Sequence, residues 1–368
     1  MKLFFSVMVL LVTAFALAIN KPQVMKRFVG SQNAPAITKP RAVKLAQLIV
    51  RHPWRPGRHQ KGVAIYMRLY KGEKPASVRL FAQRTLNYAV SLGANSVSVS
   101  FPFFINGIHG TRIYGTKATP SPGLVKDITR QAHQQKLRVT LRPLMDEANL
   151  IRDGWRGSIQ PTDRVRWFVN YRRWLRPYLQ AAKSGGATTF VIAVELNSLV
   201  DDPLWTGLLR WARRLYPGQL SYSANWDGLR GTVVEKTRPL SIDAYFNTSL
   251  PDSASVSQIT TIWNNWLRQL GLANLRAVVL SEVGIAAESG AYRHPALWGN
   301  PSARFNGGIQ QHWFTAACRA FQQNRLAGIY FWRLNLVQQP SKPASAADRG
   351  AFAGRQGARA VRQCFRAR

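Results

Sequence analysis

The stretch Phe190-Val-Ile-Ala-Val-Glu195-Leu-Asn197 places one carboxylate at the end of a continuous apolar run. A second run, Ala277-Val-Val-Leu-Ser-Glu282-Val-Gly284, has the same design. Continuous apolar runs of this length are typical of strands buried on both faces of a parallel sheet. Burying a carboxylate in such a strand is costly unless the charge is paired. We therefore expect both glutamates at the carboxyl ends of strands, where a closed parallel barrel has its active site.

As predicted strands, these two runs span Thr189–Leu196 and Ala277–Ile285. Six further apolar runs of the same kind occur along the chain. The others are Val63–Met67, Ser96–Phe104, Arg138–Met145, Leu220–Trp226, Ser241–Phe246 and Gly328–Leu334. Eight such strands in about 270 residues predict a single (β/α)8 TIM barrel, an α/β fold. The competing fold is a doubly wound open sheet, but the glycine-rich phosphate loop after its first strand is missing.

Helical periodicity fills most intervals between the predicted strands, because apolar residues recur there three and four positions apart. The predicted helices are Ala76–Leu92, Pro122–Leu137, Asp163–Lys183, Leu204–Tyr216, Ser253–Leu270 and Ile309–Asn324. Pro177 is expected to kink or split the third of them. The interval Asp227–Pro239 is too short for a full helix.

The ends of the chain differ from the barrel, which is predicted over residues 61–337. Residues 1–18 read as a signal peptide, in which Lys2 precedes an apolar core and Ala16-Leu-Ala18 provides the cleavage site. An uncleaved anchor is the alternative, although the run is short for a membrane span. Residues 19–60 read as a linker with one short helix near Arg41–Arg51, and residues 338–368 as an Arg-rich, surface-bound or loosely ordered tail. Cleavage after Ala18 predicts a secreted protein, extracellular or periplasmic.

Charge and cysteine content limit the partners. The 51 Lys and Arg residues against 16 Asp and Glu residues give a net charge of +35. Such a chain is attracted to anionic polymers, for example in a cell wall, or it carries a basic solvated surface with no dedicated partner. Nucleic acid is not expected, since no binding module is recognisable. Cys318 and Cys364 form one disulfide or remain two buried thiols. We expect a monomer.

Other hydrolytic chemistries lack their residues. The six histidines are His52, His59, His109, His133, His294 and His312; none lies in a predicted strand and none forms a pair, so neither a metal nor another cofactor is expected. The Gly-x-Ser-x-Gly turn of a serine hydrolase is also missing.

Acids, amides and aromatic rings follow the predicted strands, and their carboxyl ends meet at one rim. This mixture suits a sugar, because rings stack on its apolar faces while amides and carboxylates hold its hydroxyls. The rim residues include Arg142, Glu195, Asn225, Trp226, Asp227, Asp243, Tyr245, Glu282 and Trp332.

Most glycosidases use a pair of carboxyl groups as their catalytic residues. In a retaining enzyme one attacks the anomeric carbon, while the other protonates the leaving oxygen and then activates water. Arg142 is placed to keep the nucleophile ionised, and Tyr245 to donate a hydrogen bond to it. A salt bridge or a helix cap is the alternative role for either Glu195 or Glu282 taken singly.

Several motifs resemble glycoside hydrolase family 113 over most of residues 60–335. They are Asp153-Gly-Trp155-Arg156-Gly-Ser-Ile-Gln-Pro161, Trp167-Phe-Val-Asn-Tyr171, Ala193-Val-Glu195-Leu-Asn-Ser198, Ser221-Tyr-Ser-Ala-Asn-Trp-Asp227 and Ile242-Asp-Ala-Tyr245. The resemblance implies a retaining clan A enzyme on a (β/α)8 barrel, chiefly a β-mannan hydrolase. It further implies Glu195 as acid/base, Glu282 as nucleophile with Tyr245 beside it, and Trp332 as a stacking surface under the reactive sugar.

Two positions depart from the clan pattern. Val194 stands where many of these enzymes have Asn, so Asn225 is the candidate for holding the 2-hydroxyl. Leu144 stands where a His is expected. Trp155 is a candidate subsite residue, and Asp227 either binds substrate or caps the next turn.

These features predict a secreted retaining glycosidase that acts on β-linked hexose polymers, with mannan as the first candidate. The alternative is a non-catalytic barrel that binds a glycan or a cell wall through its basic surface. The sugar, the linkage and the choice between endo and exo action depend on the shape of the groove, which is set by loops without a periodic pattern.

Overall fold

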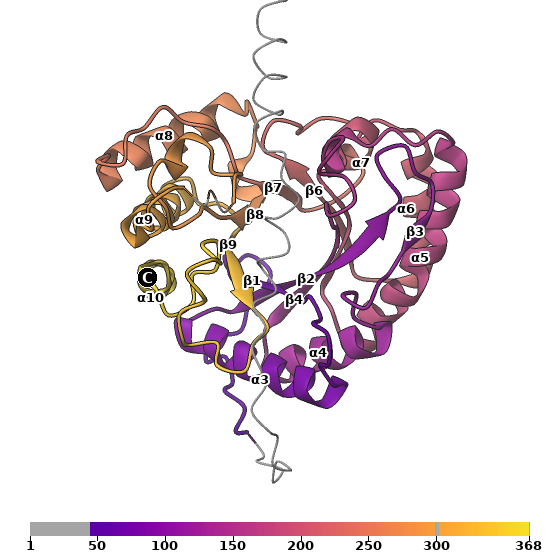
Figure 1. Cartoon of the computed structure of the whole chain (residues 1–368), viewed down its shortest axis with the longest axis horizontal. Helices are drawn as coiled ribbons and strands as arrows, with labels where there is room; N and C mark the ends of the chain where they lie inside the picture. Colours follow the sequence, from indigo (N-terminus) through magenta and orange to yellow (C-terminus); the bar gives the residue numbers. More distant parts are fainter. Residues whose placement is uncertain (1–44, 299, 301, 368) are drawn as a thin grey trace, which may run out of the picture. The chain divides into compact units, whose positions relative to one another are not determined.

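Eight parallel strands form a closed barrel in the computed structural model, which describes residues 45–298, 300 and 302–367 (Figure 1). The barrel strands are β1 (Gln60–Tyr66), β2 (Ser96–Ile105), β4 (Arg138–Met145), β5 (Thr189–Val194), β6 (Gln219–Asn225), β7 (Leu240–Asp243), β8 (Val278–Val283) and β9 (Gly328–Asn335). β1 pairs with both β2 and β9, and this closes the sheet. β3 (Ile113–Tyr114) adds a short antiparallel pair to β2. The predicted TIM barrel is confirmed.

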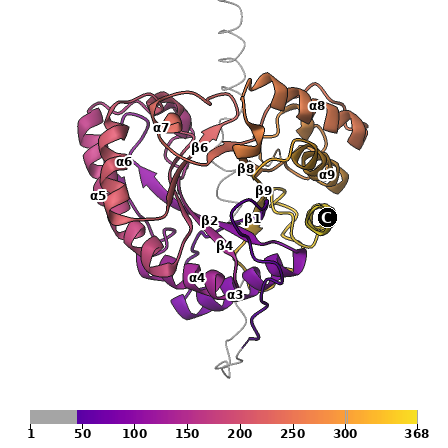
Figure 2. The same cartoon turned by 180° about the vertical axis from the view of Figure 1, so that it is seen from behind.

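Helices surround the barrel on the outside (Figure 2). They are α3 (Pro75–Leu92), α4 (Pro122–Gln134), α5 (Arg164–Gly185), α6 (Leu204–Leu215), α7 (Thr232–Glu235), α8 (Val256–Gln269), α9 (Gly307–Gln323) and α10 (Gln356–Arg366). Every helix that the sequence predicts between the barrel strands is present, and α5 continues through Pro177 without a break. The short interval after β6 holds only the four residues of α7.

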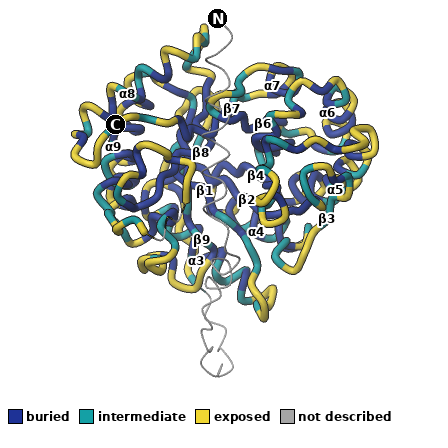
Figure 3. The backbone as a smooth tube through the Cα atoms, turned by 45° about the horizontal axis from the view of Figure 1, so that its top comes forward, coloured by how far each residue is buried: buried dark blue, intermediate teal, exposed yellow. Residues whose placement is uncertain are grey.

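Residue alternation within the strands separates a polar interior from an apolar wall. In β2, Val97 and Val99 belong to the main hydrophobic core, which packs against the helices, whereas Ser98 lines a cavity inside the barrel. All ten residues of β2 are buried, as the dark central tube of Figure 3 illustrates. Successive side chains of a strand point to opposite faces. The serines of the strands therefore face inward and prepare a polar floor beneath the strand ends.

Two expectations about the chain ends need correction. The described part of the predicted helix near residues 41–51, from residue 45 onward, is not helical. The segment 338–368 is basic, but it is not a loosely ordered tail, because it contains α10 as the eighth outer helix. Val361 and Phe365 of α10 are buried in the same core as the other helices. Residues 1–44, including the predicted signal peptide, lie outside the described part of the chain.

α10 is joined to its neighbour by a covalent bond. Cys318 of α9 and Cys364 of α10 form a disulfide that spans 46 residues of sequence. This is one of the two states that the sequence left open. The sequence did not predict α10, because Arg359, Arg362 and Arg366 give this short segment a low mean hydropathy. No helix among the described residues combines the length and apolarity needed to cross a bilayer.

We expect the double substitution Cys318→Ser with Cys364→Ser to lower the free energy of unfolding by about 2–4 kcal/mol, because the unfolded chain regains the freedom of a long loop. Urea denaturation with and without a reductant measures this. Reductant should destabilise the wild type and leave the double variant unchanged; equal curves for all samples would contradict the assignment.

Candidate active site

A buried arginine organises the carboxyl ends of β4, β7 and β8. Arg142 has no solvent exposure, and its guanidinium forms ion pairs with Glu282 and with Asp243, the latter at 2.5 Å. The same guanidinium donates a hydrogen bond to Ser223 at 3.0 Å. A buried charge is tolerated when it is paired and hydrogen-bonded. Arg142 therefore fixes the position of Glu282 and favours its ionised form.

Glu282 is held from its other oxygen by Tyr245. The Tyr245 hydroxyl donates to Glu282 Oε2 at 2.5 Å, while Arg142 binds Oε1. Burial is the main cause that raises the pKa of Tyr245 well above its usual value, with the charge of Asp243 next, so Tyr245 remains a donor. Glu282 is 6% exposed. Both contacts match the roles that the sequence predicted for Arg142 and Tyr245.

Glu195 occupies a different environment. Burial first, and then the charge of Asp243, raise the pKa of Glu195 to about 7, while Arg156 and Arg142 oppose the rise. Arg156 Nη1 donates to Glu195 Oε2 at 2.7 Å and also pairs with Glu147. The charges of Arg142 and Asp243, which pair with each other, thus both act on the carboxyl of Glu195. A carboxyl with this pKa can give and take a proton near neutral pH.

The backbone at Glu195 leaves the strand conformation. Its φ of +51° lies in the left-handed region, which non-glycine residues rarely adopt. The backbone N–H of Glu195 donates to the carbonyl of Ser223 on β6 at 2.8 Å. Glu195 therefore lies directly after Val194, the last residue of β5, and its backbone is held by β6. Such conformations are concentrated at functional sites.

Asp243 is a fully buried carboxylate beneath the rim. Besides Arg142 it accepts hydrogen bonds from the hydroxyls of Ser223 and Ser281, each at 2.9 Å. Burial raises its pKa, and Arg142 is the main opposing influence. Asp243, which the sequence grouped with the rim residues, is therefore an interior acid whose charge is paired and hydrogen-bonded.

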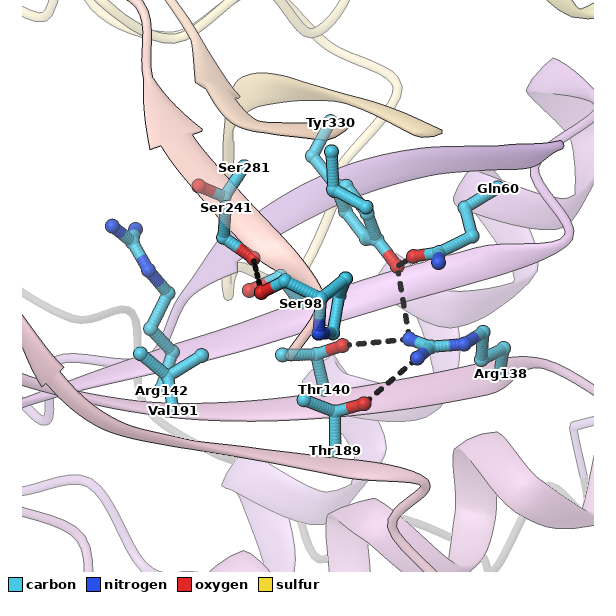
Figure 4. Close-up of a pocket in the computed structure, with 12 residues that line it drawn as sticks. Gln60, Ser98, Arg138, Thr140, Arg142, Thr189, Val191, Ser241, Ser281 and Tyr330 are labelled. Atoms are coloured by element: carbon cyan, nitrogen blue, oxygen red, sulfur yellow. Dashed lines mark hydrogen bonds between the residues drawn. The ribbon is translucent and has the colours of Figure 1, made fainter. Parts of the chain in front are cut away.

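Deeper in the barrel lies a small cavity of about 20 Å³, room for one water molecule (Figure 4). A second buried guanidinium, that of Arg138, lines it beside Thr140 and Thr189, which both accept its hydrogen bonds. Ser98 Oγ lines the same cavity and has no partner. The cavity is too small for a sugar and belongs to the polar floor.

Trp332 belongs to a small apolar cluster that is separate from the main hydrophobic core. Its ring packs with Leu144 and Val194, the two positions that depart from the clan pattern, and with Ala64 and Val191. The two departures are therefore neighbours in space and form a rigid support for the ring. Tyr66 extends the aromatic surface, with ring centroids 6.0 Å apart.

The remaining predicted residues are spread along the rim. Asn225 donates to Asp227 at 2.7 Å, so Asp227 orients Asn225. Trp226 is half-buried against the core. The ring of Trp155 folds back over Gly157, where an added Cβ would lie 2.2 Å from the ring. No contact joins Trp226 or Trp155 to either glutamate among the described interactions.

Two contributors were not predicted. Arg156 was read only as part of a motif, because the loop that brings it to Glu195 has no periodicity. Trp298 is 40% exposed in the loop after β8, and its ring lies 5.7 Å from that of Tyr245. The only feature of the sequence that could have indicated Trp298 is a tryptophan in the interval between two predicted strands. The described residues contain no group of three or more His, Cys, Asp or Glu side chains that could hold a metal ion.

Comparisons with known proteins bear on the family and on the fold. The model of Glycoside Hydrolase Family 113 matches residues 73–354. No curated protein matches the sequence. A solved structure of a family 113 beta-1,4-mannanase has a TM-score of 0.71 at 16% identity, covering 84% of this chain and all of its own. The family 113 beta-mannanase AaManA from Alicyclobacillus acidocaldarius, in complex with ManMIm, has a TM-score of 0.65 at 19% identity, covering 83% of this chain and 97% of its own. At these identities the structures establish the fold.

We expect Arg142→Met to lower the free energy of unfolding at pH 7 by about 3–5 kcal/mol, since it leaves two carboxylates buried without their cation. Loss of the cation raises the folded-state pKa of Asp243 further above its unfolded value, and such a group destabilises the fold as pH rises. The deficit should therefore shrink from pH 7 to pH 5. Urea denaturation at both values measures it, and a deficit that grows toward pH 5 would contradict the ion-pair assignment.

Proposed function

The chain belongs to glycoside hydrolase family 113, and from that membership we propose that it cleaves β-1,4-linked mannan by a retaining double displacement at Glu282 and Glu195. Membership makes it a glycosyl hydrolase. The substrate and the roles of the two glutamates are our proposal. The observation that carries it is the contrast between the environments of Glu282 and Glu195.

Glu282 is the proposed nucleophile. A nucleophilic carboxylate must be ionised and oriented, and the Arg142 ion pair and the Tyr245 hydrogen bond supply both conditions. In the first step one oxygen of Glu282 attacks the anomeric carbon as the bond to the leaving oxygen breaks. The product of this step is a glycosyl ester with Glu282.

Glu195 is the proposed acid/base. With its pKa raised to about 7, it is protonated in much of the resting enzyme below that pH and can donate to the leaving oxygen. It then takes a proton from the water that attacks the ester, which restores both carboxyls. Arg156 holds Oε2 of Glu195 and so leaves the other oxygen for the transfer.

A neutral polysaccharide suits the mouth. Three of its arginines are paired with carboxylates: Arg68 with Asp146, Arg333 with Asp348, and Arg156 with Glu195. Trp332 offers a supported ring for the apolar face of a hexose. The solved structures of similar fold include mannanases, which makes mannan our first candidate.

We further propose that the chain is exported and that its first 18 residues are removed. The N-terminal sequence motivates this, and the disulfide between Cys318 and Cys364 supports it, because disulfides persist in oxidising compartments. Mass analysis of the protein recovered outside the producing cells tests the cleavage; an intact N-terminus would contradict it.

The two glutamates should respond differently to substitution. We expect Glu282→Gln to abolish turnover of β-1,4-mannan, and Glu195→Gln to lower it by about 10²–10⁴-fold. Glu195→Gln should keep more activity on an aryl mannoside with an acidic leaving group, because that group departs without protonation.

Reducing-end assays measure turnover, and NMR of the first product distinguishes retention from inversion. Asp252→Asn, which removes an exposed rim carboxylate, serves as the control and should stay near wild-type activity. A product of inverted configuration, or sugar binding without turnover in the wild type, would refute the mechanism.

The pH profile tests the pairing of Arg156 with Glu195. Arg156 lowers the pKa of Glu195, so Arg156→Met should raise that pKa and move the alkaline limb of kcat/KM to higher pH. Arg79→Met removes an arginine paired with Asp127 on the helices and should leave the limb in place. An unmoved limb in Arg156→Met would show that Glu195 does not set it.

A further inference from the structure

The carboxylates of the chain gather on one face of the barrel. Of the 16, 14 lie in the last two residues of a strand or in the loop that follows it; the exceptions are Asp127 in α4 and Glu235 in α7. Most ion pairs of the described residues therefore lie at the catalytic mouth. In the part of the chain that the structure describes, the excess positive charge is left to the outer helices and to the opposite end of the barrel.

The densest group of these cations lies on two neighbouring helices. α5 and α6 contain no Asp or Glu, and they lie side by side on the outside of the barrel in both views (Figures 1 and 2). Seven exposed arginines define what we term the α5–α6 cationic face: Arg166, Arg172, Arg173, Arg176, Arg210, Arg213 and Arg214. None of the seven has a carboxylate partner among the ion pairs of the described residues, whereas the neighbouring Arg164 pairs with Asp202.

The face is partly preorganised. The guanidinium groups of Arg172 and Arg176 lie over the ring of Trp211, at 4.9 and 5.7 Å from its centroid. Arg213 donates to the carbonyl of Lys236 at 2.7 Å. Like charges one helical turn apart repel each other, and a bound polyanion relieves that repulsion. Guanidinium groups also bind carboxylates through two parallel hydrogen bonds.

We propose that the α5–α6 cationic face binds a carboxylated polysaccharide and holds the enzyme beside its neutral substrate. The choice of a polysaccharide rests on the proposed function, since an acidic glycan mixed with the substrate concentrates the enzyme where it acts. The site lies on the barrel wall, separate from the catalytic mouth. Glycan binding there does not require either glutamate.

The chemistry of the face favours this partner over two others. Single-stranded nucleic acid is bound by stacking its bases on exposed aromatic rings, but Trp211 is only 3% exposed and is covered by Arg172 and Arg176. Insertion into a membrane surface requires a broad apolar face. The exposed large hydrophobic residues of α5 are only Val165 and Val169, and α6 has none.

Binding of the full-length protein to immobilised polygalacturonate at 0.15 M salt tests the proposal. The test variant changes Arg166, Arg173, Arg210 and Arg214 to Gln, which leaves the two arginines over Trp211 in place. The matched control changes Arg268, Arg276, Arg319 and Arg359 to Gln, an equal loss of charge from exposed positions around α8, α9 and α10.

We expect the test variant to bind about ten-fold more weakly, because each of the four lost surface ion contacts contributes a small part of the binding free energy. The affinity of the control should change by about two-fold or less. Equal losses in both variants would overturn the proposal in favour of diffuse attraction. A loss confined to DNA or to anionic lipid vesicles would overturn it in favour of another partner. Turnover of a soluble mannooligosaccharide should be equal in all three proteins, so a failure of the proposed function is seen separately, as absent turnover in the wild type.

Discussion

The pairing of one buried guanidinium with two carboxylates is the constraint on which the rest of the site depends. Arg142 reaches Glu282 on β8 and Asp243 on β7, and it donates to Ser223 on β6. An arginine with no exposure is tolerable only with such partners. Its charge holds the Glu282 carboxylate in place, and together with Asp243 it shifts the pKa of Glu195. The pairing of the strands and the inward-facing serines therefore hold the charged groups of the site in their positions.

The distribution of charge reconciles a strongly basic chain with the neutral substrate that we propose. The scarce carboxylates lie where strands end, and there they neutralise the arginines of the mouth, such as Arg68 and Arg333. The wall formed by α5 and α6 has no carboxylate and remains cationic. Among the described residues, the excess of positive charge therefore lies on the outer surface and not at the catalytic mouth. The two regions share no side chain.

Local pattern predicted the regular elements well and the chain ends poorly. The eight strands and the helices from α3 to α9, except the short α7, follow from apolar periodicity. α10 was not predicted because its arginines lower the mean hydropathy of a short segment, although its buried residues share one face and the disulfide and Phe365 hold it against the barrel. Asn225 was assigned to substrate, and the structure shows in addition that Asp227 orients it.

The sequence by itself determined the barrel and the placement of Glu195 and Glu282 at strand ends. An apolar run that ends in a carboxylate is a local signal, because burying an unpaired charge costs free energy. Tertiary structure alone decided how these carboxyls differ. Arg156 arrives from a loop with no periodic pattern, and Arg142 crosses the barrel to strands far along the chain. The left-handed backbone at Glu195 likewise depends on its bond to β6. Protonation depends on burial and on neighbours in space, and neither can be read from the order of residues.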